Sequence, residues 1–358
     1  MDQIPYRVKN KWGFCNSNRD ITIKCVYDEI EPFKEGLALV KMNSKYGFIN
    51  NSGQIAISLN LDYAKSFSEE VSSVKIDKKI GFINKYGEFV IDCSKYRAVH
   101  SFKDGYAIYI INPDSEWEFH GIINKQGENI VKGDFYVMDY FSEGMVPVHK
   151  ESKSSTRFDY GFIDKTGNIK IPCIYQGVGK FSNDLAPVCL YDPNWIYKWG
   201  FINKQGEIII NFYFEKAGGF FEELARVRMD KKWGFINKQG YVVIKCEYED
   251  VGDFSEGFAS VKLNGLWGFI NKKGEIVIAC IFLDDKRYDI DGNSLFYFSE
   301  NLACVKINNR WGFINKEGKL VIENIYDKQS NFINGFSKVS FKSQLGYINT
   351  EGIQYWED

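Results

Sequence analysis

The residues that most often carry chemistry are few in this chain of 358 residues, which has only three histidines, His100, His120 and His149. Converging imidazoles would serve as an acid–base pair or as metal ligands. His120 and His149, however, occupy different positions in a repeated phrase described below. We therefore predict that the histidines do not converge and that they have packing or surface roles.

The eight cysteines show a pattern, because Cys25, Cys93, Cys173, Cys246 and Cys280 all fall at one position of the repeat. Zinc needs its sulfur ligands at about 2.3 Å, whereas stacked sheets lie about 10 Å apart. We predict a packing role for these thiols and no metal site. Without CxxC spacing or an export signal, reduced thiols and a cytoplasmic location are expected.

Two short motifs suggest ligand loops. "GVGK" (177–180) lacks the GxxxxGK[ST] phosphate-loop pattern, and "DIDGN" (289–293) has Phe298 where a calcium loop needs Glu. A linker and a solvated turn are predicted instead. No GxSxG or HExxH signature occurs, so we expect no catalytic residue, no cofactor and no enzyme activity.

Charge excludes some partners, because 45 Lys and Arg balance 47 Asp and Glu. A net charge of −2 gives no overall attraction to nucleic acid. The sequence contains no run of 18 apolar residues, so no membrane span is predicted. Basic residues do recur two positions before a repeated glycine, where they form either a phosphate-binding ridge or, as we predict, a solvated face. They are Lys11, Lys45, Lys79, Lys198, Lys232 and Arg310.

The dominant feature is a phrase, "KWGFINKQG" at 232–240, that returns ten times over residues 1–358 with a basic period of about 34. Such a period predicts a single array of repeats that bury their faces only against neighbours. The central glycines mark the ten copies: Gly13, Gly47, Gly81, Gly121, Gly161, Gly200, Gly234, Gly268, Gly312 and Gly346.

Each repeat reads as three short strands, as in 258–262, 267–271 and 275–279, covered on both faces. An Asn, or Asp164 in the fifth repeat, begins the turn between the second and third strands. A Gly in the fourth position takes a positive φ, except in the first repeat, which has Arg19 there. We interpret the central glycine as a seat for an aromatic side chain of the adjacent repeat. A "FSEG" turn recurs in the linkers.

The phrase and its "FSEG" partner resemble the WG repeat, named for the Trp-Gly pair. The resemblance covers nearly the whole chain and implies a bacterial β-rich repeat protein whose repeats serve as binding scaffolds; it implies no mechanism. The Trp position departs from the pattern in five repeats, at Tyr46, Ile80, His120, Tyr160 and Leu345.

Two architectures fit an all-β array. We predict an open, twisting stack of ten three-stranded meanders, because the chain begins at a first strand and ends after a third, so that no sheet is shared between the ends. The alternative is a closed β-propeller-like ring, although propellers usually have four to eight four-stranded blades.

Three consecutive repeats lengthen the loop between their first and second strands, as "NPDSEWEFH", "ESKSSTRFD" and "DPNWIYK". Such loops lie at one edge of a stack, and exposed aromatic and Arg residues are typical of interfaces. We predict a partner-binding site there, or else a local minicore. The predicted site residues are Trp117, Phe119, His120, Arg157, Phe158, Trp195 and Tyr197.

The predicted function is therefore a non-enzymatic interaction scaffold for an unknown protein partner. A glycan or cell-wall binding module is the alternative. An enzyme whose site is assembled across repeats is the third reading, and it predicts a pocket with strongly perturbed titratable groups.

Overall fold

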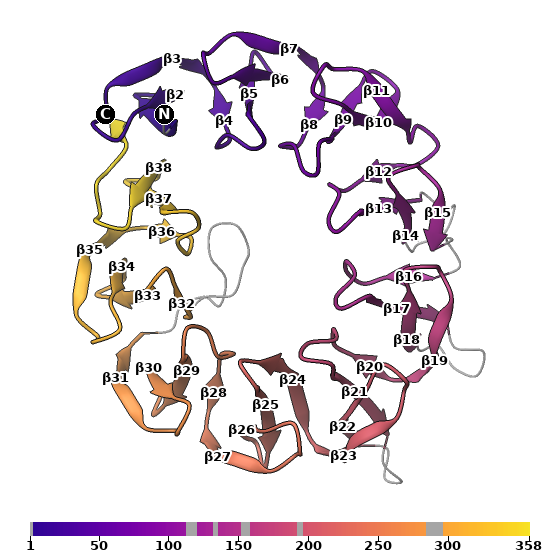
Figure 1. Cartoon of the computed structure of the whole chain (residues 1–358). Coiled ribbons are helices and arrows are strands. Elements are labelled where there is room, and N and C mark those ends of the chain that lie inside the picture. The colour runs from indigo at the N-terminus through magenta and orange to yellow at the C-terminus, as the bar shows by residue number, and fades with distance from the viewer. Residues whose placement is uncertain (1–2, 112–119, 132–134, 152–157, 192–195, 284–295) are drawn as a thin grey trace. The chain divides into compact units, whose positions relative to one another are not determined.

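The computed structural model describes residues 3–111, 120–131, 135–151, 158–191, 196–283 and 296–358, and every regular element in these ranges is a strand (Figure 1). The chain forms two compact halves. The N-terminal half contains residues 1–174 and 355–358, and the C-terminal half contains residues 175–354.

The strands of the first five sheets are β1 (Ile4–Val8), β2 (Lys11–Cys15), β3 (Ile21–Tyr27), β4 (Glu29–Ile30), β5 (Leu37–Met42), β6 (Lys45–Asn50), β7 (Ile55–Leu61), β8 (Tyr63–Ala64), β9 (Ser72–Ile76), β10 (Lys79–Ile83), β11 (Phe89–Asp92), β12 (Ala98–Val99), β13 (Tyr106–Ile110), β14 (His120–Asn124), β15 (Asn129–Val131), β16 (Tyr136–Val137), β17 (Met145–Glu151), β18 (Phe158–Asp164), β19 (Ile169–Tyr175) and β39 (Trp356–Glu357). Those of the other five sheets are β20 (Gly177–Val178), β21 (Ala186–Tyr191), β22 (Tyr197–Ile202), β23 (Ile208–Phe214), β24 (Lys216–Phe221), β25 (Leu224–Met229), β26 (Lys232–Ile236), β27 (Val242–Tyr248), β28 (Asp250–Val251), β29 (Phe258–Leu263), β30 (Leu266–Asn271), β31 (Ile276–Phe282), β32 (Phe298–Ser299), β33 (Leu302–Ile307), β34 (Arg310–Ile314), β35 (Leu320–Tyr326), β36 (Lys328–Gln329), β37 (Phe336–Phe341) and β38 (Gln344–Asn349).

Each repeat forms one small antiparallel sheet, and the sheet β28-β29-β30-β31 is typical. The three predicted strands are present as β29, β30 and β31. The prediction of three-stranded units was incomplete, because the linker adds β28, in which Val251 pairs with Val261. In the described residues, nine sheets have four strands and one has three.

The turn prediction is confirmed. The side-chain oxygen of Asn271 accepts hydrogen bonds from the backbone N–H groups of Lys273 (2.9 Å) and Glu275 (3.1 Å), and Gly274 has a φ of +81°. Arg19 adopts a φ of +68° at the equivalent position. That turn therefore keeps its shape despite the cost of a left-handed conformation for a residue with a Cβ.

The central position requires glycine for a reason other than the predicted packing of an aromatic side chain against it. A Cβ at Gly268 would lie 2.5 Å from the carbonyl oxygen of Ile278 and 2.7 Å from the backbone nitrogen of Cys280. The register between β30 and β31 shifts at this point, so that the third strand crosses directly over the glycine. The aromatic-seat interpretation was wrong, because backbone of the same sheet occupies the space.

The "FSEG" turns join neighbouring sheets. Phe254 of one such turn packs on Phe235 of the preceding sheet, with ring centroids 4.8 Å apart. The hydroxyl of Ser255 in the same turn donates to the carbonyl oxygen of Phe298 in the next turn, at 2.8 Å. The Phe contact recurs in both halves, for example between Phe48 and Phe67 at 4.9 Å. This motif is thus structural.

The glutamate of the turn completes the junction. The carboxylate of Glu222 accepts a hydrogen bond from the N–H of Gly257 in the next turn (3.1 Å) and pairs with Lys272 (3.0 Å). Glu69 makes the same contacts in the N-terminal half, with Gly105 (3.0 Å) and Lys125 (3.2 Å).

The two ends of the chain meet in one sheet of the N-terminal half. Strand β39 pairs parallel to β1, in the place that the linker strand fills in other sheets. The Tyr6 hydroxyl donates to Glu357 at 2.7 Å. The open-stack prediction was wrong on this point, because it allowed no sheet to be shared between the ends. The pairing is the one that the propeller-like alternative predicts.

Candidate functional site

The predicted loop site lies largely outside the described residues. Trp117, Phe119, Arg157 and Trp195 fall in the gaps, and Phe158 is described only as the first residue of β18. The site on the lengthened loops therefore stays a prediction. His120 and Tyr197 are described, and each is considered within its own half.

Tyr197 begins β22 and is 45 % exposed. Its ring stacks on Tyr191 at a centroid distance of 4.4 Å, and the Tyr191 hydroxyl donates to the Tyr197 hydroxyl at 2.7 Å. The two rings thus hold each other at the base of the lengthened loop.

The prediction that the histidines do not converge was wrong. Burial lowers the pKa of His100 and of His149, and the nearby His120 contributes to both shifts, after Lys65 in the case of His100. The convergence arises because β14, which carries His120, faces the next sheet: its Nδ1 lies 3.2 Å from the carbonyl oxygen of Val137 in β16. The sequence positions alone did not reveal this seam.

The histidine cluster is arranged for packing. The ring of His149 stacks on Tyr136 (4.5 Å, 4° between planes) and lies 5.0 Å from Tyr160. Burial lowers the pKa of His149 to about 4, so the ring is neutral at pH 7. Within the described ranges, no set of three or more His, Cys, Asp or Glu residues is placed to hold a metal ion.

The thiols are buried or partly buried, and burial makes them poorly nucleophilic. All eight cysteines lie in the described ranges, and none forms a disulfide. Burial raises the pKa of Cys15, Cys93 and Cys189 to about 12, so they stay protonated. The Sγ atoms of Cys246 and Cys280 lie 3.9 Å from backbone carbonyl oxygens of the first strand of their own sheets, which supports the predicted packing role.

The two suspected ligand loops fare differently. In "GVGK", Gly177 and Val178 form β20 and pair with β21, so the linker prediction is confirmed. "DIDGN" lies outside the described residues.

Three of the six recurring basic residues form ion pairs along the surface. Lys11 pairs with Asp28 (2.5 Å), Lys45 with Asp62 (2.6 Å) and Arg310 with Asp327. Each acid belongs to the linker that follows. These charges are locally balanced, which favours the solvated face over a phosphate-binding ridge.

An apolar row is exposed on the third strands of the C-terminal half. Strands β23, β27 and β31 are each the edge of their sheet, and each exposes its first two residues. The turn glycine before each strand packs on the preceding third strand; a Cβ at Gly274 would lie 3.2 Å from the side chain of Ile244. The outer row, as we call it, consists of Ile208, Ile209, Val242, Val243, Ile276 and Val277, which are between 41 and 52 % exposed.

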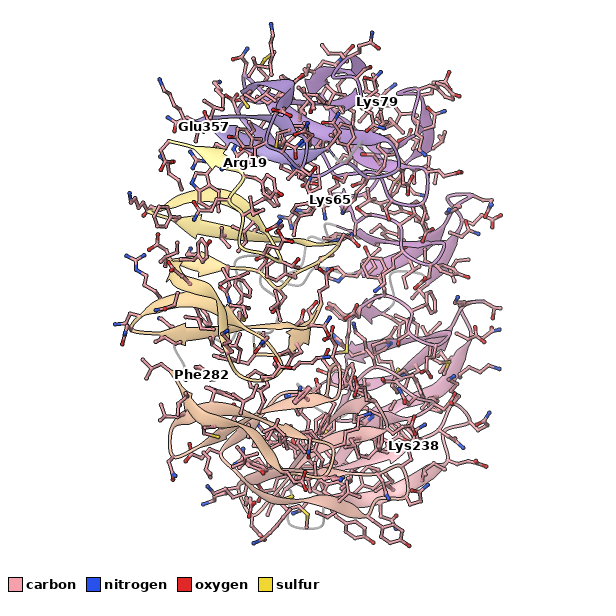
Figure 2. All side chains as sticks on the ribbon, turned by 60° about the vertical axis from the view of Figure 1, so that its left-hand side comes forward. Arg19, Lys65, Lys79, Lys238, Phe282 and Glu357 are labelled. Carbon is pink, nitrogen blue, oxygen red and sulfur yellow. The ribbon has the colours of Figure 1, made fainter. Side chains whose placement is uncertain are left out.

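The hairpins beside the outer row are held by ion pairs. Lys238, in the turn before β27, pairs with Glu223 at 3.0 Å (Figure 2). Phe282, at the other end of β31, is buried, as are the last residues of β23 and β27. The beginning of each of these third strands is therefore apolar and open, and Tyr213 (62 % exposed) and Ile281 (64 %) are exposed near the ends of β23 and β31.

Family models match the chain in ten segments, described as "WG containing repeat", at residues 12–46, 46–79, 80–112, 121–153, 160–192, 199–233, 233–267, 267–282, 293–311 and 311–342. The chain belongs to the WG-repeat family. This confirms the resemblance found in the sequence. No match to a curated protein was found.

Solved structures resemble the WG-repeat chain only distantly. Hsv2 of Kluyvelomyces marxianus is 9 % identical, with a TM-score of 0.32, over 66 % of this chain and 88 % of its own. Oligopeptidase B from Leishmania major is 8 % identical, with a TM-score of 0.37, over 86 % and 53 %. Kuenenia stuttgartiensis hydrazine synthase is 10 % identical, with a TM-score of 0.31, over 66 % and 92 %.

In the part of the WG-repeat chain that the structure describes, no helix has the length and apolar character needed to cross a membrane.

Proposed function

We propose that this WG-repeat protein is a non-enzymatic scaffold of the cytoplasm that binds a protein partner. The repeated phrase supports this function indirectly, because its residues have structural roles in the fold. The central glycine accommodates a crossing strand, the Asn and Gly form a turn, and the aromatic and acidic residues join neighbouring sheets. Recognition would therefore depend on surface residues outside these positions.

The outer row carries the proposal. Aliphatic residues such as Val242 (47 % exposed) and Ile276 (49 %) recur at one position in successive sheets, and contiguous exposed apolar surface marks interaction sites. The residues are β-branched and aliphatic. A sugar-binding surface would instead present aromatic faces, so the row favours a protein over a glycan.

The lengthened loops of repeats four to six are a second proposed face for the same partner. The exposed Tyr191–Tyr197 pair supports it, since rigid tyrosines are enriched at interfaces. An enzymatic function has less support. The histidine cluster is the group closest to the expected perturbed site, and the ring of its His149 is stacked on Tyr136.

A pull-down from native lysate tests the proposal with matched variants. Ile208→Lys/Val242→Lys adds two charges to the outer row, and Gln205→Lys/Gln239→Lys adds the same charge three residues earlier in the same two hairpins. We expect the wild type and the control variant to capture the same partner protein, and the outer-row variant to fail to capture it.

The loop face is tested in the same experiment with Trp117→Ala/Phe158→Ala/Trp195→Ala. Loss of the partner with this variant alone would place the site on the loops. If all variants captured the partner equally, both faces would be wrong. If the folded wild type captured no protein, the scaffold proposal would fail, and a polysaccharide screen would follow.

A further inference from the structure

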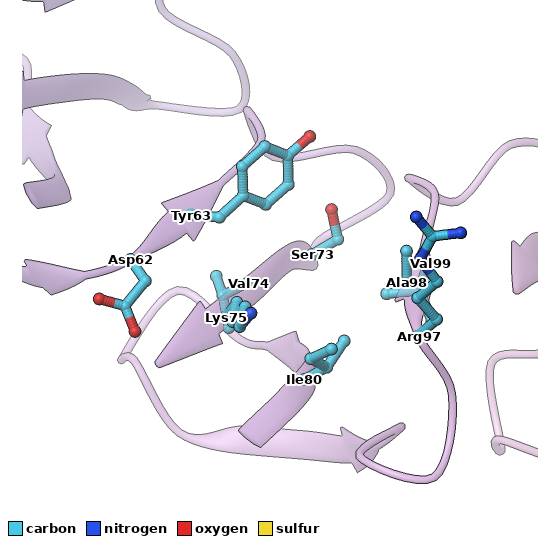
Figure 3. A pocket seen from close by; sticks show the side chains of 9 residues that line it. All are labelled: Asp62, Tyr63, Ser73, Val74, Lys75, Ile80, Arg97, Ala98 and Val99. Atoms are coloured by element: carbon cyan, nitrogen blue, oxygen red, sulfur yellow. The ribbon is translucent and has the colours of Figure 1, made fainter. Parts of the chain in front are cut away.

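A pocket of about 410 Å³ lies within the N-terminal half, between the sheet β8-β9-β10-β11 and strand β12 of the next sheet (Figure 3). Its apolar walls are Val74, Ile80, Ala98 and Val99, and Lys75 also lines it. Figure 3 shows Lys75 and Ile80 on one side of the pocket and Ala98 on the other. A cavity of this size can hold a small organic ligand or one large side chain of another protein.

Ile80 occupies the position of the Trp in the Trp-Gly pair. In register, Lys75 of β9 pairs with Ile80 of β10, as Lys262 pairs with Trp267 in the typical sheet. The other four repeats of the N-terminal half have a ring at this position, and the only other aliphatic residue there is Leu345 of the C-terminal half. Those four residues are Trp12, Tyr46, His120 and Tyr160. Within the N-terminal half, Ile80 is therefore the one residue at this position without a ring.

The tryptophans at this position in other repeats show how such a ring is held. The ammonium group of Lys262 lies 5.9 Å from the centroid of the Trp267 ring. The ammonium group of Lys306 lies 5.8 Å from that of Trp311. Both tryptophans are buried, and Trp267 stacks on Phe296, which precedes the next sheet, at a centroid distance of 5.2 Å. A ring at this position thus fills the space between a lysine of its own sheet and the residues that lead into the next.

The sheet before the pocket shows which groups the pocket lacks. There the Lys41 ammonium lies 5.1 Å from the centroid of the Tyr46 ring, and that ring packs edge-on against Tyr63 of the next linker at 6.3 Å. The residues at the pocket that are equivalent to these two tyrosines are Ile80 and Ala98. Both rings of the pair are therefore replaced by smaller aliphatic side chains. In the described part of the chain, no ring lies under the ammonium group of Lys75.

We infer that this pocket binds an aromatic ring, which takes the place that Trp267 fills in its own sheet. The Lys75 ammonium covers the face of the bound ring, and Ile80 and Val99 pack beside it. A cation is attracted to the face of an aromatic ring but not to a saturated ring of the same size. Burial of the ring against the apolar walls adds to the affinity. The inference depends neither on the outer row nor on the scaffold function.

The ring can come from two sources, a free aromatic compound or an aromatic side chain of another protein, and the experiment separates them. The probes are 4-methylphenol, its saturated counterpart 4-methylcyclohexanol, and the peptide Gly-Gly-Trp-Gly-Gly blocked at both ends. Binding is followed by methyl NMR of the full chain at Val74, Ile80 and Val99, because the ring current of a bound aromatic group shifts these signals. We expect saturable shifts with the phenol, the peptide or both, and about five-fold weaker binding of 4-methylcyclohexanol than of the phenol.

Variants test the assigned residues. Ile80→Trp should restore the ring of the other repeats, fill the pocket and abolish the shifts at Val74 and Val99, whereas Ile80→Val should keep them. Lys75→Met should weaken binding of 4-methylphenol about five-fold and leave that of 4-methylcyclohexanol unchanged. Lys78→Met, which makes the same change in the hairpin turn outside the pocket, should alter neither, and this pair serves if Ile80→Trp does not fold. The inference would be overturned by the absence of saturable shifts with both the phenol and the peptide, by equal affinity for the saturated probe, or by unchanged binding in folded Ile80→Trp.

Discussion

The central glycine of the repeat can be tested by a matched pair of Gly→Ala substitutions three residues apart. At Gly268 the new Cβ would lie 2.5 Å from the Ile278 oxygen, 2.7 Å from the Cys280 nitrogen and 2.8 Å from the Ala279 carbonyl carbon. All three atoms are backbone, so no side chain can move aside. At Gly265 nothing lies within 4 Å, and the only penalty is the φ of +80°.

The magnitudes follow from these two geometries. A left-handed alanine at position 265 should cost about 1–2 kcal/mol. Overpacking costs about 1–3 kcal/mol when side chains can adjust, and here the register of β31 must shift, so Gly268→Ala should cost more than about 3 kcal/mol. The substitution at 268 should therefore be the more damaging by at least about 1 kcal/mol.

The assay is urea unfolding of the full chain followed by tryptophan fluorescence. Because repeats can unfold in steps, midpoints are compared and not extrapolated free energies. We expect a much larger fall in the midpoint for Gly268→Ala. An equal or smaller fall than that of Gly265→Ala would refute the account of the central glycine as the crossing point of the third strand.

Three further predictions concern the junctions and the histidines. Glu222→Ala, which removes the acceptor for Gly257 and the partner of Lys272, should lower stability by about 1–2 kcal/mol, with Glu222→Gln losing less, as judged by urea midpoints. Arg19→Gly should raise stability by about 0.5 kcal/mol, because it relieves a φ of +68°; a lower melting temperature would contradict this. The pKa of His149 is lowered to about 4 in the folded state from 6.5, so the unfolded chain binds more protons between these values and stability should fall as pH drops through this window. Since the ring is partly solvated, the loss should be about 1 kcal/mol, and His149→Phe should remove it from a pH series of melts.

Local features of the repeat could be predicted from the sequence because they depend on neighbours in the chain. The Asn271–Gly274 turn and the three strands around Gly268 follow from residue types and spacing. The fourth strand, Asp250–Val251, could not be predicted, because a strand of two residues is too short to show the alternation of side chains that identifies a strand in a sequence. The pairing of β39 with β1 was equally hidden, since it joins residues about 350 positions apart.

The candidate sites were predicted less well than the fold. The outer row could not be recognised in the sequence, because its strands show no alternation of polar and apolar residues. Val242 and Val243 are both exposed, whereas the equally apolar Ile244 is buried by a turn of the next sheet.

The scaffold function is tested most directly by site-specific photo-crosslinking in living cells. A benzophenone side chain is placed at Val243 in the outer row and, as a control, at Tyr86, which is 86 % exposed in a turn of the N-terminal half. The account predicts a discrete covalent adduct with one protein from position 243, lost when Ile208→Lys is added, and none from position 86. No adduct at 243, or the same adducts from both positions, would contradict it.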